Sequence, residues 1–321
     1  MYFFERKWRG LDIVVSKILL LAIVMLVGFL AAKTGYIKGL KNATSTLITR
    51  ITLPLLVITT LSGQAKNAET QNTALCVFIL GIVFVAILLL LGKFSTVLFR
   101  FDKKKSDVHT CLTAFGNTIF LGYPLLEAIW GPTAVFYAAF FSIANDLAAW
   151  TIGVLILCRG GKGTLDLKRL LNPATLSYVI GAIMFMMSVR MPGVIHDAAA
   201  TVGSTTMVLS MLFLGATLAG VRFRELLAGF SSVTIVIIKM LLVPIGAFYA
   251  LRWLMPALAL PVDMLIIPIV CVELAMPCQS VFAILSQEFG GDTEYAATAI
   301  CLTTAASLFT LPFICSFILK G

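Results

Sequence analysis

The residues of this chain that could do chemistry are charged, amide and proline residues set inside long apolar stretches. The ionisable ones are Arg50, Glu127, Asp146, Lys239 and Glu273. A charge at the centre of a lipid bilayer costs at least roughly 2.5 kcal/mol even on lenient insertion scales, so such residues are functional candidates by default. The chemistry they suggest is the binding of an ion, a proton or a charged substrate.

An amide, a glycine and a proline interrupt the apolar stretch Asn117-Thr118-Ile119-Phe120-Leu121-Gly122-Tyr123-Pro124-Leu125-Leu126. The ring of Pro124 removes one backbone donor and clashes with the carbonyl four residues earlier, while Gly122 adds conformational freedom. Freed backbone groups are tolerated in a membrane only where they line a cavity or are buried in protein. We therefore expect a broken transmembrane helix here, with its break at Pro124.

A second interruption lies far downstream at Pro277, in Glu273-Leu274-Ala275-Met276-Pro277-Cys278-Gln279-Ser280. A matched pair of interrupted spans in the two halves of a chain points to the binding site of a secondary transporter near the bilayer midplane. Half-helix N-termini after the two prolines favour an anion. Neutral donors and acceptors near the breaks come from Asn117, Asn145, Gln279 and Ser280.

The charged residues have both a structural and a functional interpretation. In the structural one, Lys239 pairs with Asp146 or Glu273 and holds the helices together. In the functional one, the carboxylates of Glu127, Asp146 or Glu273 couple transport to an ion or proton. Arg50 lies four residues before Pro54, so it either binds a substrate carboxylate bidentately or extends to the membrane surface.

Composition places the chain among polytopic membrane proteins. About 60% of its residues are apolar and 12% are charged, and its mean hydropathy is +1.02. Soluble domains are near half apolar and a quarter charged. The net charge of +9 is dispersed over short loops, which indicates orientation in a membrane and no nucleic-acid partner.

Spans of roughly 20 apolar residues divide the chain into ten predicted transmembrane helices. Five spans in each half is an odd number, so the second half enters the membrane from the opposite side as an inverted repeat. The expected units are residues 1–158, a cytoplasmic linker at 159–172, and residues 173–321. The predicted spans are residues 12–32, 43–62, 73–97, 108–129, 132–158, 173–190, 194–219, 227–252, 262–286 and 293–319.

The sidedness of Lys and Arg predicts the orientation. The richer set should be cytoplasmic, which places both termini outside, although the basic N-terminal segment opposes this. The richer set is Lys33, Lys38, Lys41, Arg100, Lys103, Lys104, Lys105, Arg159, Lys162, Lys168, Arg169, Arg222 and Arg224, and the other is Arg6, Lys7, Arg9, Lys66, Arg190, Arg252 and Lys320.

Other functional classes fit poorly. The seven cysteines occur singly without CxxC spacing, and only His109 and His196 are present, so we expect no metal site and no cofactor. The segment around Gly160-Gly161-Lys162-Gly163 lacks the spacing of a phosphate-binding loop, and neither HExxH nor GxSxG occurs. The apolar run from Ile18 to Ala32 lacks a convincing signal-peptide cleavage site. An enzyme is therefore not expected.

Five motifs in order resemble the auxin efflux carrier family, which includes PIN-type plant auxin carriers and bacterial permeases for malonate and other organic acids. The resemblance covers nearly the whole chain. The motifs are Leu53-Pro54-Leu55-Leu56, the Asn117 to Leu126 stretch with Gly131, Phe213-Leu214-Gly215-Ala216-Thr217-Leu218, Met276-Pro277-Cys278-Gln279 with Val281-Phe282-Ala283, and Thr310-Leu311-Pro312.

The resemblance implies an all-α fold of two inverted five-helix repeats, with helices 4 and 9 broken and crossing as in sodium/proton antiporters. It implies that substrate binds beside the crossing, at Asn117, Pro124, Pro277 and Gln279. Two features depart from many members: no long hydrophilic loop lies between Arg159 and Arg169, and position 208 is valine instead of proline. The first departure suggests the short, prokaryotic type. The family likeness also suggests a homodimer, and the oligomeric state stays open.

These observations predict a multi-pass secondary transporter of the cytoplasmic membrane that moves a small organic anion by alternating access. The coupling ion is H⁺, Na⁺ or none, because some family members move anions down the membrane potential alone. Two alternatives stay open. One is a membrane receptor or sensor that binds an organic acid without moving it, and the other is an anion channel, since broken helices also build channel filters.

Overall fold

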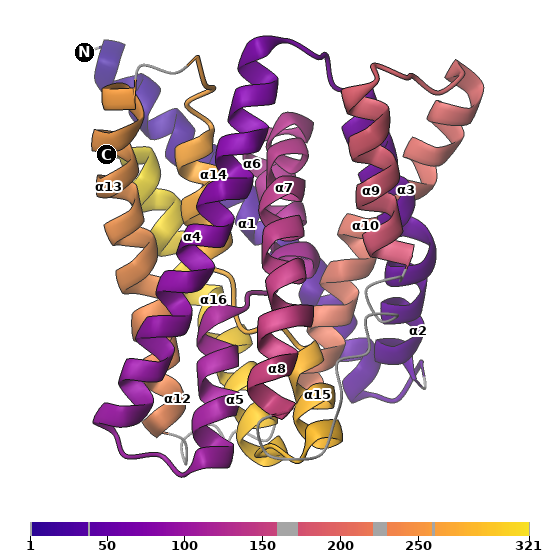
Figure 1. The fold of residues 1–321 in the computed structure, drawn as a ribbon. Coiled ribbons are helices and arrows are strands. Elements are labelled where there is room, and N and C mark those ends of the chain that lie inside the picture. The colour runs from indigo at the N-terminus through magenta and orange to yellow at the C-terminus, as the bar shows by residue number, and fades with distance from the viewer. Residues whose placement is uncertain (1, 38, 159–172, 221–229, 259–260, 321) are drawn as a thin grey trace.

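The computed structural model describes residues 2–37, 39–158, 173–220, 230–258 and 261–320, and nearly all of these are helical (Figure 1). Within the described residues the only β-structure is one isolated bridge. The elements are α1 (Tyr2–Lys33), α2 (Leu40–Leu47), η1 (Ile48–Thr52), α3 (Leu53–Gly63), α4 (Ala68–Leu98), α5 (Lys103–Ala114), η2 (Thr118–Gly122), α6 (Tyr123–Trp130), α7 (Pro132–Ala148), η3 (Ala149–Gly153), α8 (Val154–Cys158), α9 (Pro173–Met186), α10 (Gly193–Ala219), α12 (Phe230–Ile235), η5 (Val236–Leu242), α13 (Val243–Leu258), α14 (Ile266–Leu274), α15 (Val281–Phe289) and α16 (Thr293–Lys320), where η marks a π-helix.

Six helical segments among the described residues are long and apolar enough to cross a membrane. Three shorter apolar helices, Leu19–Lys33, Thr118–Trp130 and Pro173–Met186, accompany them. The prediction of an all-helical polytopic membrane protein is therefore confirmed. The six segments are Leu40–Gly63, Ala68–Leu98, Pro132–Cys158, Gly193–Ala219, Ser231–Ala257 and Thr293–Lys320.

Three of the π-helices end directly before a proline-containing turn. The α-helix resumes with Leu53-Pro54 after η1, with Tyr123-Pro124 after η2 and with Val243-Pro244 after η5. Proline lacks the N–H that would bond to the carbonyl four residues earlier, and its ring clashes with that carbonyl. A local π-helical widening is one way in which membrane helices accommodate the freed group.

The helices form two bundles. The small bundle consists of α1, α2, η1, α3, α9 and α10, which pack chiefly on one another, and the large bundle contains the remaining elements. In Figure 1, α2, α3, α9 and α10 lie on the right and α4, α12, α13 and α14 on the left. The bundles meet where α1 packs on α6 and α16, α3 on α7, and α10 on η2.

Two glycines allow α1 and α10 to pack backbone against backbone in the small bundle. A Cβ atom on Gly28 would overlap the backbone of Leu212, and one on Gly215 would overlap the backbone of Met25. Without a hydrophobic driving force between helices in lipid, such close approach of small residues is a main source of helix association. The contact therefore brings the backbones of α1 and α10 into direct van der Waals contact.

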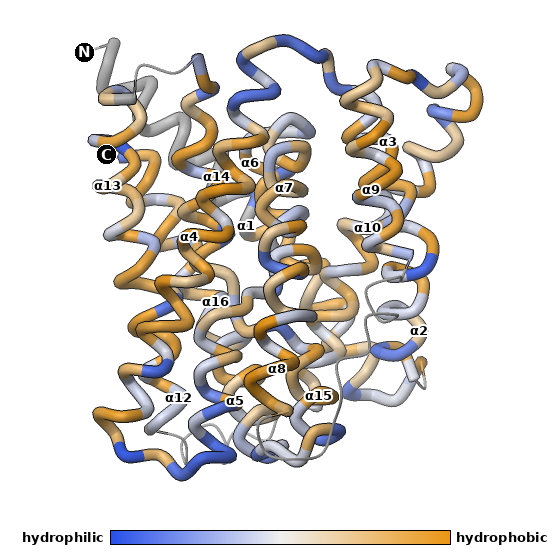
Figure 2. Tube along the Cα trace, in the orientation of Figure 1, coloured by the Kyte–Doolittle hydropathy of each residue, from blue (hydrophilic) through white to orange (hydrophobic). Residues whose placement is uncertain are grey.

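The start of α1 and the end of α16 lie at one end of the molecule, and the loop between α4 and α5 lies at the other (Figure 1). Hydrophilic residues gather at both ends, including the α4–α5 loop and the start of α4 (Figure 2). Arg100, Lys103, Lys104 and Lys105 belong to the α4–α5 end. The predicted linker at 159–172 and several predicted cytoplasmic cations, Lys38, Arg159, Lys162, Lys168, Arg169, Arg222 and Arg224, lie outside the described residues.

Candidate functional site

Two interrupted helices meet in the large bundle. α5 ends at Ala114 and η2 begins at Thr118, while α14 ends at Leu274 and α15 begins at Val281. The segments between them, residues 115–117 and 275–280, run antiparallel and are called here the crossing. Its two strands are joined by the backbone bridge between Gly116 and Cys278.

Backbone hydrogen bonds across the crossing replace those that the helices lose. The Asn117 N–H donates to the Pro277 carbonyl at 2.8 Å, and the Gln279 N–H donates to the Phe115 carbonyl at 3.1 Å. Unpaired backbone groups are costly in an apolar interior, and here the backbone groups of each break form hydrogen bonds with those of the other. Neither interruption would be stable at this depth alone.

The sequence predicted that the first break lies at Pro124, but the structure places it elsewhere. The helix is interrupted at residues 115–117, and Pro124 stands in the first turn of α6 behind the π-helix η2. The physical reason is that η2 accommodates the missing donor of the proline, whereas the pairing with residues 277–279 requires an extended backbone at Gly116. Pro277, in contrast, lies within the crossing and supplies the carbonyl that receives Asn117.

Two side chains from neighbouring helices hold the centre of the crossing. Asn145 on α7 accepts the Gly116 N–H on its Oδ1 at 3.2 Å, and its Nδ2 donates to the Gly116 carbonyl at 3.5 Å. Thr303 on α16 accepts the Cys278 N–H at 3.2 Å. Sequence reasoning selected Asn145 but missed Gly116 and Thr303, because an isolated threonine in an apolar helix carries no signal of its partner.

An amide and a carboxylate link the second strand of the crossing to α7. Asp146 Oδ1 accepts a hydrogen bond from Gln279 Nε2 at 3.1 Å and another from Asn145 Nδ2 at 3.2 Å. The Gln279 Oε1 atom is buried and has no hydrogen-bond partner among the described residues. Gln279 therefore retains one acceptor that a bound molecule could satisfy.

Two helix N-termini point at the crossing. Asn117 precedes η2 and accepts the Phe120 N–H on its own Oδ1 at 3.3 Å, and only 5% of its surface is exposed. Ser280 precedes α15 without a side-chain hydrogen bond to that helix. The first backbone N–H groups of a helix carry partial positive charge, so both ends favour a negative group.

A cavity of about 290 Å³ lies beside the crossing, between α7 with η3 and α9 of the small bundle. Asp146 is in its wall, and Trp150 and Tyr178 contribute aromatic surface. The Tyr178 hydroxyl is hydrogen-bonded to the Tyr123 hydroxyl on α6 at 2.8 Å. The other lining residues are Ile143, Leu147, Thr175, Val179, Ala182 and Ile183.

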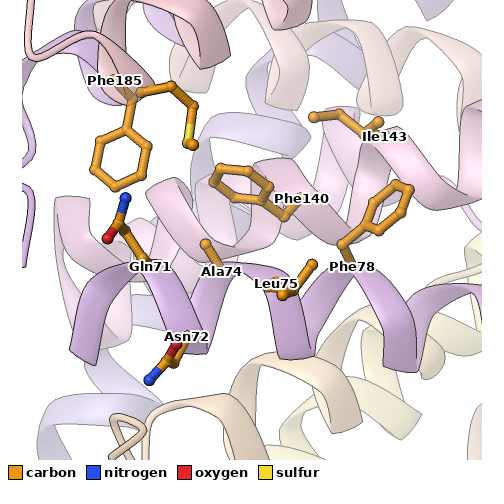
Figure 3. A pocket seen from close by; sticks show the side chains of 9 residues that line it. Gln71, Asn72, Ala74, Leu75, Phe78, Phe140, Ile143 and Phe185 are labelled. Carbon is orange, nitrogen blue, oxygen red and sulfur yellow. The ribbon is translucent and has the colours of Figure 1, made fainter. Parts of the chain in front are cut away.

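A second cavity of about 370 Å³ lies between α4, α7 and α9 (Figure 3). Its wall is aromatic and aliphatic apart from Gln71 and Asn72 near the start of α4. Ile143 lines both cavities, so the two adjoin along α7 and α9. Together they extend from one end of α4 to Asp146. The lining residues are Gln71, Asn72, Ala74, Leu75, Phe78, Phe140, Ile143, Phe185 and Met186.

Lys239 and Glu273 are both 1% exposed, and both line a small pocket next to Gly116 of the crossing. Lys239 Nζ donates to the Thr113 carbonyl at 3.2 Å, near the C-terminus of α5. Neither carboxylate oxygen of Glu273 has a hydrogen-bond partner within the described part of the chain. The direct ion pair of Lys239 with Asp146 or Glu273, one interpretation of the sequence, does not occur among the salt bridges between described residues.

Arg50 and Glu127 stand apart from the crossing. Arg50 is exposed in η1, which packs on α9 and α10. Glu127 is half-buried on α6, one turn after Pro124. Among the hydrogen bonds and ion pairs of the described residues, none joins either side chain to the crossing.

The described residues hold no group of three or more His, Cys, Asp or Glu side chains that could bind a metal ion. The polar groups at the crossing are amides, hydroxyls and backbone atoms together with Asp146. This set suits the recognition of a small polar molecule or a proton.

Comparison with known proteins identifies the family. A family model described as "Membrane transport protein" matches residues 13–166 and 162–315. The chain belongs to this family, the auxin efflux carriers. An uncharacterized transporter of Methanocaldococcus jannaschii is 25% identical over 305 residues, covering 92% of this chain and 95% of that protein. An uncharacterized transporter of Methanothermobacter thermautotrophicus is 27% identical over 217 residues, covering 66% and 68%.

Membership of this family confirms the resemblance that the five sequence motifs indicated. It also supports transmembrane transport as the general role of the chain, because both archaeal relatives are named as transporters. The family is one of membrane transporters and not of enzymes.

Proposed function

We propose that this carrier is a secondary transporter that moves a small carboxylate across the cytoplasmic membrane by alternating access. Ten helices in two inverted repeats, residues 1–158 and 173–321, would form the transport unit, with both termini outside. The observation that carries the proposal is the crossing: two broken helices whose N-termini meet beside a cavity between two bundles.

The position of the breaks supports an inverted repeat. The α5–η2 break falls within the first family match, residues 13–166, and the α14–α15 break falls within the second, residues 162–315. Interrupted helices in corresponding halves are the usual architecture of a midplane transport site. The large bundle would then carry both breaks, and the small bundle, with its close α1–α10 contact, would be the unit against which it moves.

The helix N-termini at Asn117 and Ser280 support an anionic substrate group. A carboxylate placed there would meet the first backbone N–H groups of these helices and the Asn117 amide. The adjoining cavity is mostly apolar, with Trp150 and Ile143 in its wall. Cavities of this kind hold the apolar part of a ligand while a few polar groups orient it. A carboxylate with a short apolar body fits this division.

Counterflow in proteoliposomes tests the proposal. Vesicles loaded with an unlabelled acid should take up the same radiolabelled acid faster than empty vesicles, and malonate, phenylacetate and indole-3-acetate form the first panel. A carrier shows this acceleration because unlabelled substrate that leaves the vesicle returns the binding site to the outer face, where labelled substrate can bind. A receptor or a channel shows no such acceleration. Absence of counterflow with every acid of a wider panel of mono- and dicarboxylates would contradict the proposal.

Replacing Asn117 with Ala should abolish counterflow while leaving folded protein in the membrane. The change removes the amide and the cap on Phe120, which costs about 1 kcal/mol of stability, too little to unfold the chain. Asn42→Ala, on the exposed surface of α2, is the matched control and should transport normally. Wild-type counterflow by the Asn117 variant would remove this residue from the substrate site.

One observation favours a second candidate, transport of an organic cation. Asp146 lies in the wall of the cavity beside Trp150 and Tyr178, and a carboxylate with aromatic faces is a typical amine-binding set. The same counterflow assay with short primary and quaternary amines separates the two functions. Counterflow of amines and not of acids would establish the second candidate and overturn the first.

A further inference from the structure

A small chamber beside the crossing, too narrow to hold a water molecule, has two buried side chains of opposite charge in its wall. Glu273 from α14 and Lys239 from η5 line it together with Gly116 and Asn145 of the crossing region, and the rest of its wall is apolar. Both charged side chains are 1% exposed. Neither Lys239 nor Glu273 lines the cavity that Asp146 borders.

The two charges do not satisfy each other. No salt bridge within 4.0 Å joins them in the described part of the chain, and both oxygens of Glu273 are without a hydrogen-bond partner there. Burying an ionised carboxylate without a partner is costly, and proteins usually avoid the cost by keeping the group neutral. Asp146 differs, because two amide N–H groups stabilise its carboxylate. A single proton added to this region therefore binds to Glu273 in preference to Asp146.

The chamber also contacts both segments of the first broken helix. A Cβ atom on Gly122 in η2 would lie 2.9 Å from Glu273 Oε2, so the carboxylate rests against that turn. Lys239 binds the Thr113 carbonyl near the end of α5. A change of charge in the chamber therefore changes the interactions of the segments on both sides of the break that carries Asn117.

We propose that Glu273, with Lys239 in the wall of the same chamber, is the proton site that couples transport to a proton gradient. This inference rests on the proposed transport function. When Glu273 is ionised, the carboxylates of Glu273 and Asp146 outnumber the Lys239 ammonium and leave one excess negative charge, which disfavours a bound anion. One proton taken up on a Glu273 oxygen removes that excess. A monoanion and a proton then enter together and leave the net charge of the region as it was.

Other titratable groups near the chamber are Asp146 from α7, Tyr123 from α6 and Cys278 from the crossing, and the α4 side chains in its wall are apolar. Lys239 argues against a metal cation as the occupant, because a bound Na⁺ would be repelled by an ammonium in the same small space. A proton needs no such space and neutralises Glu273 directly.

Infrared titration of the purified full chain in liposomes tests the site without any substrate. Among the carboxylic-acid C=O bands that appear on acidification, one should be absent in Glu273→Gln and present in Glu69→Gln, the same change at an exposed position of α4. A band that persists in Glu273→Gln would overturn the assignment. If that variant fails to fold, Lys239→Met should shift the pH at which the wild-type band appears, and an unchanged band would equally overturn it.

Transport of radiolabelled malonate and phenylacetate tests the coupling. Glu273→Gln should retain counterflow, which needs no net proton movement, and should lose accumulation driven by an inward proton gradient to the level of protein-free liposomes. Glu69→Gln should retain both. A wild type that shows counterflow but accumulates neither acid under an inward proton gradient would overturn proton coupling and leave the carrier function standing. Counterflow of neither acid would count against the carrier function, and the infrared titration would still decide the proton site.

Discussion

Asn145 is the side chain on which the backbone of the crossing most depends. Its Oδ1 accepts a hydrogen bond from the Gly116 N–H. The backbone bridge between Gly116 and Cys278 does not satisfy this N–H, so a side chain must do so. Asn145→Ala should lower the free energy of unfolding by about 1–3 kcal/mol, the cost of an unsatisfied buried donor. Thermal unfolding of the detergent-solubilised protein measures this. Asn42→Ala, exposed on α2, is the control, and equal stability of the two variants would contradict the assigned role.

At the residue scale the sequence predicted which side chains are unusual but not how they meet. Lys239 and Glu273 are deeply buried, as ionisable residues in apolar stretches should be when they serve a site. The expected direct pair is absent among described residues, and Arg50 is exposed. Spacing along one helix cannot tell how far that helix rotates toward its neighbours, and this rotation decides whether two charges touch.

The α1–α10 contact is the tightest helix pair that the structure shows at the scale of elements. Gly215→Ala would place a Cβ atom into the backbone of Met25, and backbone cannot move aside as a side chain can. We expect a loss of about 3 kcal/mol of stability, at the upper end of overpacking effects. Gly246→Ala on α13, where nothing lies within 4 Å of the new atom, is the matched control and should be neutral or slightly stabilising.

Thermal unfolding in detergent compares the two glycine variants with the wild type. A Gly215→Ala protein as stable as Gly246→Ala would show that α1 and α10 are free to separate. That result would also weaken the proposal that the small bundle is the rigid unit of the transport cycle.

The broken helices show what sequence can and cannot locate. Proline, glycine and amide residues marked both interruptions, and the second one lies at Pro277 as expected. The first one lies seven or more residues before Pro124, because the pairing partner, and not the proline, fixes where the backbone must be extended. A proline predicts that a helix is weakened nearby. Only the tertiary contact selects the residue at which it opens.

At the scale of the whole molecule, a cavity lies between the two bundles, where α7 of the large bundle faces α9 of the small one. If substrate enters there, filling the cavity from the α9 side should stop transport without disturbing the crossing. Ala182 lines the cavity and is half-buried, so Ala182→Phe would occupy much of its 290 Å³. Counterflow should fall to the background of protein-free liposomes, while thermal stability should stay near that of the wild type.

Ile180→Phe supplies the matched control for this variant, because Ile180 lies on the same helix, is 46% exposed and lines neither cavity. The same aromatic ring at that position should leave counterflow unchanged. Normal counterflow by Ala182→Phe would show that substrate reaches the crossing by another route, and the small bundle would then contribute no surface to the substrate path. Loss of counterflow in the Ala182 variant alone would place the moving boundary between α7 and α9, where rocking of one bundle against the other would open and close access to Asn117 and Gln279.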